Sequence, residues 1–462
     1  MTLLPNIAQR ALAVLALGVS PGAALAAGPD AVLRGAIDPA ASEVTGTATL
    51  SAKKTGRALP VAKVQPQGAD NQPAAAVENG ARPATATDPY SALGIRLGSF
   101  LVLPSVEVTS GYSTNPSRAA GGSPAAVVTV APQAILRSDW ARHSASLTLR
   151  GAYEKSSDDS QSAKVSFGAE GAAHLDVSQD LGADLGAGYK LDHQNVTDPA
   201  FPAGADRPPA VHTITGAAAL VRGIGPSEFT VKVDGSRSIY EDAVGSGVTI
   251  DQGDRNNAVG ELRLRAGYKI SPAVVPFAEA GIGRRVFDRT VNAGGYTPSG
   301  GIYLARVGFA FNDGPVLTGE GAVGWRAEMR DDERLPSLAG LTFDSSLVWS
   351  PTRLLTATLN AATLFSPQPD PASAGSIKYD LSADIAYLLR TNFTLHALAS
   401  AGIERFDNGG IDLKYALGAS ADWRLNRTLG LTAKFTHEWT DAADTARDFT
   451  AETVNVGVRL QR

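Results

Sequence analysis

The stretch "ETVNVGVRLQR" (452–462) alternates between apolar and polar side chains. From Val454 to Leu460 every second residue is apolar, and Asn, Gly, Arg and Gln stand between or beyond them. A period of two places the two sets on opposite faces of a β-strand. Terminal residues usually fray unless they are tied into a sheet. This stretch therefore predicts a final strand that is itself part of a wall.

The same alternation continues through most of the chain, from about residue 101 to 461. It is clear in "IKYDLSADIAYLL" (377–389), "DLKYALGASADWRL" (412–425) and "LGLTAKFTHEW" (429–439). Each segment has one apolar face and one face of charged and small polar residues. The period indicates strands rather than helices.

The connections between these strands alternate in length. One set is short, at 139–143, 178–180, 225–227, 271–274, 313–315, 350–353, 390–392 and 426–427. The other set is longer and rich in Gly, Pro and Asp, and includes 113–125, 195–209, 243–256, 289–300 and 366–375. We expect about eighteen antiparallel strands, closed into an all-β, up-and-down transmembrane β-barrel. Closure would pair the last strand with the first, because a barrel leaves no free edge.

The residues before the barrel have a different character. A charge at Arg10, the apolar run "ALAVLALGV" and the site Ala24-Leu25-Ala26 predict a signal peptide over 1–26, cleaved after Ala26. Residues 27–90 are rich in Ala, Pro, Lys and Gln without periodicity, which predicts a disordered periplasmic linker. The barrel would then occupy 91–462.

Composition narrows the class of protein further. The chain has no cysteine, so disulfides and Cys-based metal or redox chemistry are excluded. The formal net charge is −5 and no long basic run occurs, so nucleic acid is not an expected partner. No apolar stretch after the signal is long enough for a membrane-spanning helix.

A soluble sandwich or propeller would show the same period, and the aromatic residues help to separate the alternatives. Transmembrane barrels place aromatic girdles at both membrane interfaces, where the ring contacts headgroups. The expected membrane-interface tryptophans are Trp140, Trp349 and Trp423 at short-turn ends, and Trp325 and Trp439 towards long-loop ends, with Tyr153, Phe287, Phe365 and Phe406. This placement favours a barrel in the cell outer membrane, with lipids around it.

Two stretches also resemble a known family. In "DPYSALGIRLGSFLVLPSVEVTSGYSTNPSR" (88–118), an Asp-Pro and a "GIRLGSF" phrase precede a strand with Pro104, Ser105 and Glu107. This opening, together with the ending "VGVRLQR", resembles a family of porin-like outer-membrane β-barrel proteins of Gram-negative bacteria. That resemblance implies an association with exopolysaccharide export, and a periplasmic polysaccharide-export protein as a partner. Gly457 and Leu460 fit the terminal signal read by the barrel-assembly machinery, whereas Arg462 stands where an aromatic residue is expected.

If the apolar set faces lipid, the other set lines the interior. The expected channel-lining residues carry both charges, and are Lys164, Glu170, Asp184, Lys190, Glu261, Arg263, Arg265, Lys269, Lys378, Asp380, Asp384, Lys414, Asp422, Arg424, Lys434, Glu438 and Arg459. Arg263, Arg265 and Lys269 form the densest basic group. They predict either a constriction for anionic solutes or ion pairs that hold the wall together.

Catalytic motifs are missing from the sequence. None of the six histidines stands in a recognisable nucleophile, metal-binding or phosphate-binding motif, so we expect no enzyme activity and no cofactor. An exopolysaccharide conduit is the predicted function. A general diffusion porin for small solutes and a closed structural or adhesive barrel are the alternatives.

Overall fold

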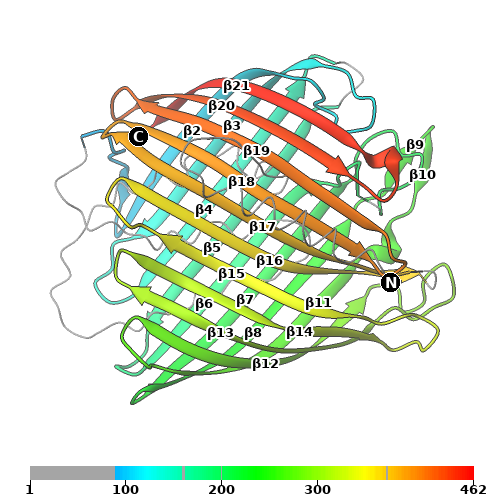
Figure 1. The fold of residues 1–462 in the computed structure, drawn as a ribbon, viewed down its shortest axis with the longest axis horizontal. Helices are drawn as coiled ribbons and strands as arrows, with labels where there is room; N and C mark the ends of the chain where they lie inside the picture. Colours follow the sequence, from blue (N-terminus) through cyan, green and yellow to red (C-terminus); the bar gives the residue numbers. More distant parts are fainter. Residues whose placement is uncertain (1–88, 159–161, 199, 371–372) are drawn as a thin grey trace, which may run out of the picture.

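The computed structural model describes residues 89–158, 162–198, 200–370 and 373–462. The expected signal peptide and nearly all of the expected linker lie outside the described residues. Within them, the alternating segments form long antiparallel strands that close into a barrel (Figure 1). The all-β barrel predicted from the period of two is confirmed.

Eighteen long strands make the wall, and the three-residue β1 (Ile95–Leu97) pairs with the start of β2. The first seven are β2 (Phe100–Ser113), β3 (Ala125–Ser138), β4 (Ser144–Ser156), β5 (Lys164–Asp176), β6 (Leu181–His193), β7 (Ala210–Ile224) and β8 (Ser227–Tyr240). The next six are β11 (Asn257–Tyr268), β12 (Val274–Phe287), β13 (Gly300–Asp313), β14 (Leu317–Arg330), β15 (Leu338–Trp349) and β16 (Leu355–Asp370). The last five are β17 (Ser373–Arg390), β18 (Phe393–Phe406), β19 (Ile411–Arg424), β20 (Leu429–Asp441) and β21 (Phe449–Gln461).

The last strand pairs with the first, as the opening stretch predicts. The register of β2 against β21 runs from Ser105 opposite Gln461 to Ser113 opposite Thr453. This ladder closes the sheet, so that neither strand presents a free edge. The C-terminal strand is therefore part of the wall.

Short turns and longer loops alternate around the barrel as expected. At the end where the C-terminus lies, the connections are two to five residues long, from 139–143 to 425–428 (Figure 1). At the other end the loops reach 194–209 and 241–256, and the latter carries the small hairpin of β9 (Ala243–Gly245) and β10 (Val248–Ile250). We call these the short-turn end and the long-loop end.

One expected long loop is wrong. Segment 366–375 was predicted as a loop from its Pro, Asp and Gly content, but β16 ends at Asp370 and β17 begins at Ser373. These are the two longest strands, with 16 and 18 residues. Their extra length comes from their pairing with each other, which runs to Pro367 opposite Gly375 and, after a register shift, to Asp370 opposite Ser373.

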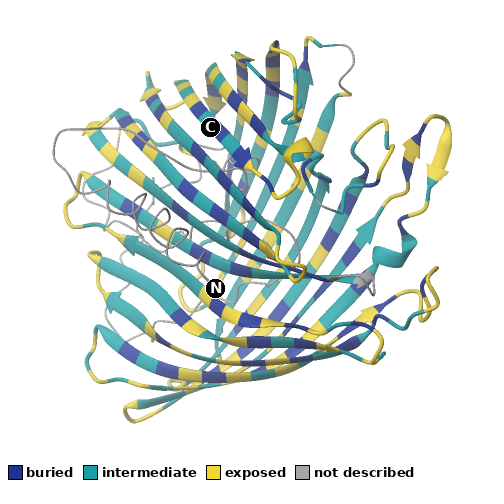
Figure 2. Ribbon diagram, turned by 45° about the vertical axis from the view of Figure 1, so that its right-hand side comes forward, coloured by how far each residue is buried: buried dark blue, intermediate teal, exposed yellow. Residues whose placement is uncertain are grey.

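The two faces of the wall differ sharply in chemistry. Outward side chains are apolar and exposed, such as Leu264 at 56% and Val456 at 60%, whereas the inward Arg263 is only 1% exposed. Figure 2 shows this as alternating bands along each strand. A soluble β-protein buries its apolar face, so the inverted arrangement fits an apolar solvent outside the barrel. Among the described residues, no helix is long and apolar enough to cross a membrane.

Most of the aromatic residues expected at the interfaces point outward. Trp140, Trp325, Trp349 and Trp423 are 42–52% exposed, and Trp439 stacks on Tyr415 with ring centroids 5.2 Å apart. Their contact with headgroups stays a prediction.

Three of the other expected interface aromatics are placed differently. Phe287 is 4% exposed and lies on the inward face of β12, the same face as Glu279 and Arg285. Phe365 packs against buried apolar residues of β15 and β17. Phe406 lies on the same face of β18 as Glu404, with the Arg447 guanidinium 5.8 Å from its ring centroid. These three rings do not lie on the open outer surface.

The face assignment can be tested on β19. Leu417 lies outward at mid-strand, and Ser420 lies inward against a polar cavity. Leu417→Arg should lower the unfolding free energy in lipid vesicles by about 2–4 kcal/mol, because a charge then faces the hydrocarbon midplane. Ser420→Arg is the matched control and should cost much less in the same urea titration. Equal losses would contradict the assignment of the two faces.

Candidate channel lining

All seventeen expected lining residues lie on or beside the barrel strands, opposite the exposed apolar set. Lys269 is one residue beyond the end of β11, and the rest lie within strands. Several are nearly inaccessible, including Lys414 at 6% and Glu438 at 2%. The alternation of β5, β6, β11 and β17–β21 puts them there. Their part in conducting a solute stays a prediction.

Arg263 stands at the centre of a buried ion-pair network on the inner wall. Its Nη2 lies 2.5 Å from Glu261 Oε2, its Nε lies 3.5 Å from Asp234 and its Nη1 lies 3.8 Å from Glu279. These carboxylates come from β11 itself and from its neighbours β8 and β12. One guanidinium therefore cross-links three strands from inside.

The network continues over the next strands. Arg306 on β13 donates to Glu279 at 2.9 Å and lies 3.3 Å from Asp344 on β15. Arg326 on β14 lies 2.7 Å from Glu261 and 2.9 Å from Glu328. Acids and bases thus alternate along the inner wall from β8 to β15.

The basic group singled out in the sequence is part of this wall. Arg265 pairs with Glu320 at 2.7 Å and lies 3.4 Å above the ring centroid of Phe277, while Lys269 pairs with Glu228 at 3.5 Å. With Arg263, each of the three cations has a carboxylate neighbour. Of the two interpretations that the sequence left open, ion pairing that holds the wall is the one this geometry favours.

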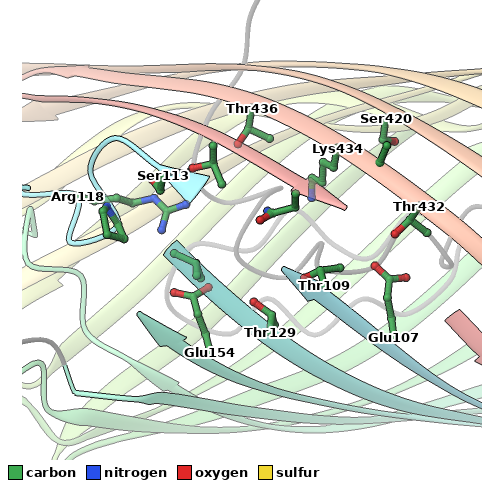
Figure 3. Close-up of a pocket in the computed structure, with 15 residues that line it drawn as sticks. Glu107, Thr109, Ser113, Arg118, Thr129, Glu154, Ser420, Thr432, Lys434 and Thr436 are labelled. Atoms are coloured by element: carbon green, nitrogen blue, oxygen red, sulfur yellow. Dashed lines mark hydrogen bonds between the residues drawn. The ribbon is translucent and has the colours of Figure 1, made fainter. Parts of the chain in front are cut away.

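A polar cavity of about 70 Å³ lies beside the seam where the barrel closes. Figure 3 shows side chains from β2, β3 and β20 turned towards a common space, with the loop after β2 at one side. Hydroxyl groups dominate the lining, together with Asn455, Lys434, Glu107 and Glu154. These groups can hydrogen-bond to water or to sugar hydroxyls.

Two ion pairs hold this seam region from within. Arg459 on the last strand lies 2.6 Å from Glu107 on the first, and both are at most 6% exposed. Arg118, in the loop after β2, adopts a left-handed backbone with φ of 52° and lies 2.6 Å from Glu438 on β20. The loop is thereby fixed against the inner wall.

Loops at the long-loop end are also tied to one another across the mouth. Arg447, in the loop before β21, pairs with the fully buried Asp412 and donates to the carbonyl of Thr197, in the loop after β6, at 3.3 Å. In the loop between β14 and β15, Asp332 accepts hydrogen bonds from the Arg334 guanidinium and from backbone amides. These bonds hold the pKa of Asp332 below its ordinary range. The first of these contacts, from Arg447 to Thr197, joins the loop before β21 to the loop after β6.

Histidines on the inner wall have carboxylate partners but do not form metal sites. His174 lies 2.8 Å from Asp184 and 3.2 Å from Asp176, and His396 lies 3.2 Å from Asp384. In the part of the chain that the structure describes, no group of three or more His, Asp or Glu side chains could hold a metal ion.

Several lining residues were missed from the sequence. They are Lys232, Asp234, Glu279, Arg285, Arg306, Arg326 and Glu328, together with the seam residue Glu107. Strands β12–β14 carry many Gly and Ala residues on both faces. The difference in hydrophobicity between the two faces of each strand is therefore small. The charges at every second position of "WRAEMR" (325–330), namely Arg326, Glu328 and Arg330, were nevertheless a usable signal.

Comparison with known proteins gives one family and several distant structures. The family model described as "Putative beta-barrel porin 2" matches residues 88–462. No curated protein matches. The copper transporter OprC has 10% identity, with a TM-score of 0.41 over 80% of this chain and 81% of that one. The siderophore receptor PirA from Acinetobacter baumannii has 8% identity, with a TM-score of 0.36 over 78% and 80%. At these values the two likenesses say nothing about a solute.

The ion pair at the seam yields a stability prediction. Glu107→Ala should lower the unfolding free energy by about 3–5 kcal/mol, because it leaves the buried guanidinium of Arg459 without its carboxylate. The control is Glu170→Ala, which removes a half-exposed partner 3.6 Å from Arg150 and should cost less than about 1 kcal/mol. Urea unfolding of the refolded barrel measures both. Similar losses for the two variants would show that the seam pair does not hold the barrel closed.

Proposed function

We propose that this chain, which belongs to the family described as "Putative beta-barrel porin 2", forms a channel through the outer membrane. The observation that carries the proposal is a closed barrel of eighteen strands with a charged and hydroxylated inner face. A barrel of this strand number encloses more space than inward side chains can fill. Polar walls of this kind pass hydrated solutes because they replace hydration without binding tightly.

The cargo we propose is a polysaccharide. Two arguments support it, namely the resemblance of 88–118 to barrels associated with exopolysaccharide export and the hydroxyl-rich cavity beside β2. The ion-paired wall also favours an uncharged polymer over a selected anion, because each cation of the basic group already has a carboxylate neighbour. A periplasmic export protein is then the expected partner at the short-turn end.

A general diffusion porin remains the second candidate. The observation in its favour is that inward aromatic rings, on which sugars could stack, are buried beside arginines. The Arg265 guanidinium lies 3.4 Å from the ring centroid of Phe277, and that of Arg330 lies 5.8 Å from the ring centroid of Phe287. A polymer would therefore have to slide along hydroxyl and charged groups rather than along aromatic faces.

Conduction is tested in planar bilayers with the purified chain. Discrete current steps are expected, both for the mature chain and for a variant that lacks residues 27–88. Complete silence of both would contradict the channel and favour a structural or adhesive barrel.

Cargo is tested by deleting the gene and restoring it from a plasmid. Export of polysaccharide predicts a loss of cell-surface polysaccharide with normal uptake of small solutes, and recovery on complementation. Unchanged polysaccharide with slower uptake of small solutes would favour the general porin instead.

A further inference from the structure

The ladder between β15 and β16 is the shortest between neighbouring barrel strands. It covers five residue pairs, from Ser345 opposite Ala361 to Trp349 opposite Ala357. On its other edge β15 pairs with β14 over its whole length, from Trp349 to Leu338. The backbones of β15 and β16 are therefore paired at the short-turn end and not at the long-loop end. Figure 1 shows β16 and β17 diverging from β15 in that direction.

Beyond the last β15–β16 pair, Ser345 opposite Ala361, the β16–β17 hairpin lies on the lumen side of β15. Leu338, on the inward face of β15, packs against Ile377, Ala374 and Phe365 of the hairpin. A Cβ at the inward-facing Gly340 would lie 2.5 Å from Ile377 Cδ1. The outward side chains of the hairpin, such as Ile377 and Phe365, are therefore covered by the inward face of β15. We call the described residues Ala362–Gln368 and Ala374–Tyr379 the inner hairpin.

The inner hairpin also contacts the inner-wall network. The Arg326 guanidinium lies 5.6 Å from the ring centroid of Phe365, and Arg330 donates to the carbonyl of Gln368 at 2.9 Å. The other Arg330 nitrogen donates to the carbonyl of Pro298 at 2.7 Å, in the loop before β13. Arg330, at the end of β14, therefore joins the hairpin to the loop before β13.

Side chains replace the backbone hydrogen bonds that the short ladder lacks. Thr363 Oγ1 accepts from the Phe343 amide at 2.7 Å and donates to the Phe343 carbonyl at 3.0 Å. The Tyr379 hydroxyl donates to the Leu341 carbonyl at 3.1 Å. The five-pair register, if extended, places Thr363 opposite Phe343. The strands are thus in register for full pairing but held apart by one layer of side chains.

The backbone of the hairpin is irregular at Gly375 and Pro367. Gly375 has a φ of 116°, and a Cβ there would lie 2.1 Å from the Ser366 carbonyl oxygen. The β16–β17 register shifts after Pro367, next to this glycine. Only glycine tolerates such a backbone.

We propose that the inner hairpin is the gate of the channel, a claim that rests on the proposed function and adds its regulation. In the closed state it occupies the lumen beneath β15. In the open state β16 extends its ladder along β15 from Ala361 towards Gln368, and backbone hydrogen bonds replace those of Thr363 and Tyr379. Phe365 then joins the outward aromatic set that the sequence predicted for it. A wall element with two packed arrangements is a two-state switch.

Movement of the hairpin is tested first without reference to current. The chain has no cysteine, so a single bimane label on Phe365→Cys reports its own surroundings in vesicles that contain a nitroxide lipid. The label should be protected in the native background and strongly quenched when Arg330→Ala is added. A label on Phe343→Cys, which is outward and 53% exposed, should be quenched in both. Protection of position 365 in both backgrounds would overturn the gate.

Current recordings test the consequence. Arg330→Ala should raise the fraction of time spent open by up to about tenfold, as expected for the loss of the hydrogen bond to Gln368, which only the closed state makes. Arg284→Ala, which removes a guanidinium paired with Asp331 outside the hairpin, should not change it. A short cross-link between Gly340→Cys and Ile377→Cys in the Arg330→Ala background, made with a bis-methanethiosulfonate reagent that forms a disulfide with each cysteine and releases methanesulfinate, should abolish the increase.

The control cross-link joins Tyr303→Cys and Ala327→Cys, an adjacent pair in the complete β13–β14 ladder, and should leave gating unchanged. If Arg330→Ala barrels conduct equally with and without the cross-link between positions 340 and 377, the gate is wrong while the channel stands. If no variant conducts but the label at 365 still moves into lipid, the proposed function fails and the hairpin movement stands.

Discussion

Every backbone N–H and C=O group inside a hydrocarbon layer needs a partner from the protein. Closure of the sheet supplies most of these partners, and side chains of Thr363 and Tyr379 supply others where the β15–β16 ladder is short. The β2–β21 ladder completes the circle, and the buried Glu107–Arg459 pair joins the same two strands on the inside. Once the circle is closed, one face of each strand must meet lipid and the other must meet the lumen. The alternation of apolar and polar residues follows from that geometry rather than from any single contact.

Closure also explains how charge is distributed inside. A lumen shared by many strands brings side chains together that are far apart in sequence, so Arg265 on β11 reaches Glu320 on β14. The resulting network is close to neutral locally, which stabilises the wall without creating a strong site for one ion. Arg326 connects this network to Phe365 on the inner hairpin. The ion-pair network of the inner wall and the inner hairpin therefore share a side chain, that of Arg326.

The fold could be predicted from local pattern, whereas the pairing of charges and the inner hairpin could not. The period of two at 452–461 and the alternation of loop lengths suffice for the number of strands and for the phase of β19–β21, because both are local properties. The partners of Arg263 depend on the register of β11 against β8 and β12, and local sequence pattern does not determine that register. Segment 366–375 has the composition of a loop, yet its two arms pair within the β16–β17 hairpin, and Ala374 packs in a cluster with Leu338 of β15. The inward position of Phe287 could not be predicted, because the Gly- and Ala-rich β12 gives little contrast between its two faces.

The central claim is that the exposed apolar face meets lipid while the polar face encloses a water-filled lumen. The most direct measurement is a spin-label scan of single cysteines over 453–461 in lipid vesicles, comparing collision with oxygen and with a water-soluble nickel complex. The account predicts a period of two on β21, with oxygen accessibility highest at Val454, Val456 and Val458, and nickel accessibility highest at the residues between them. High nickel accessibility at all positions, or the opposite phase, would contradict the barrel as described.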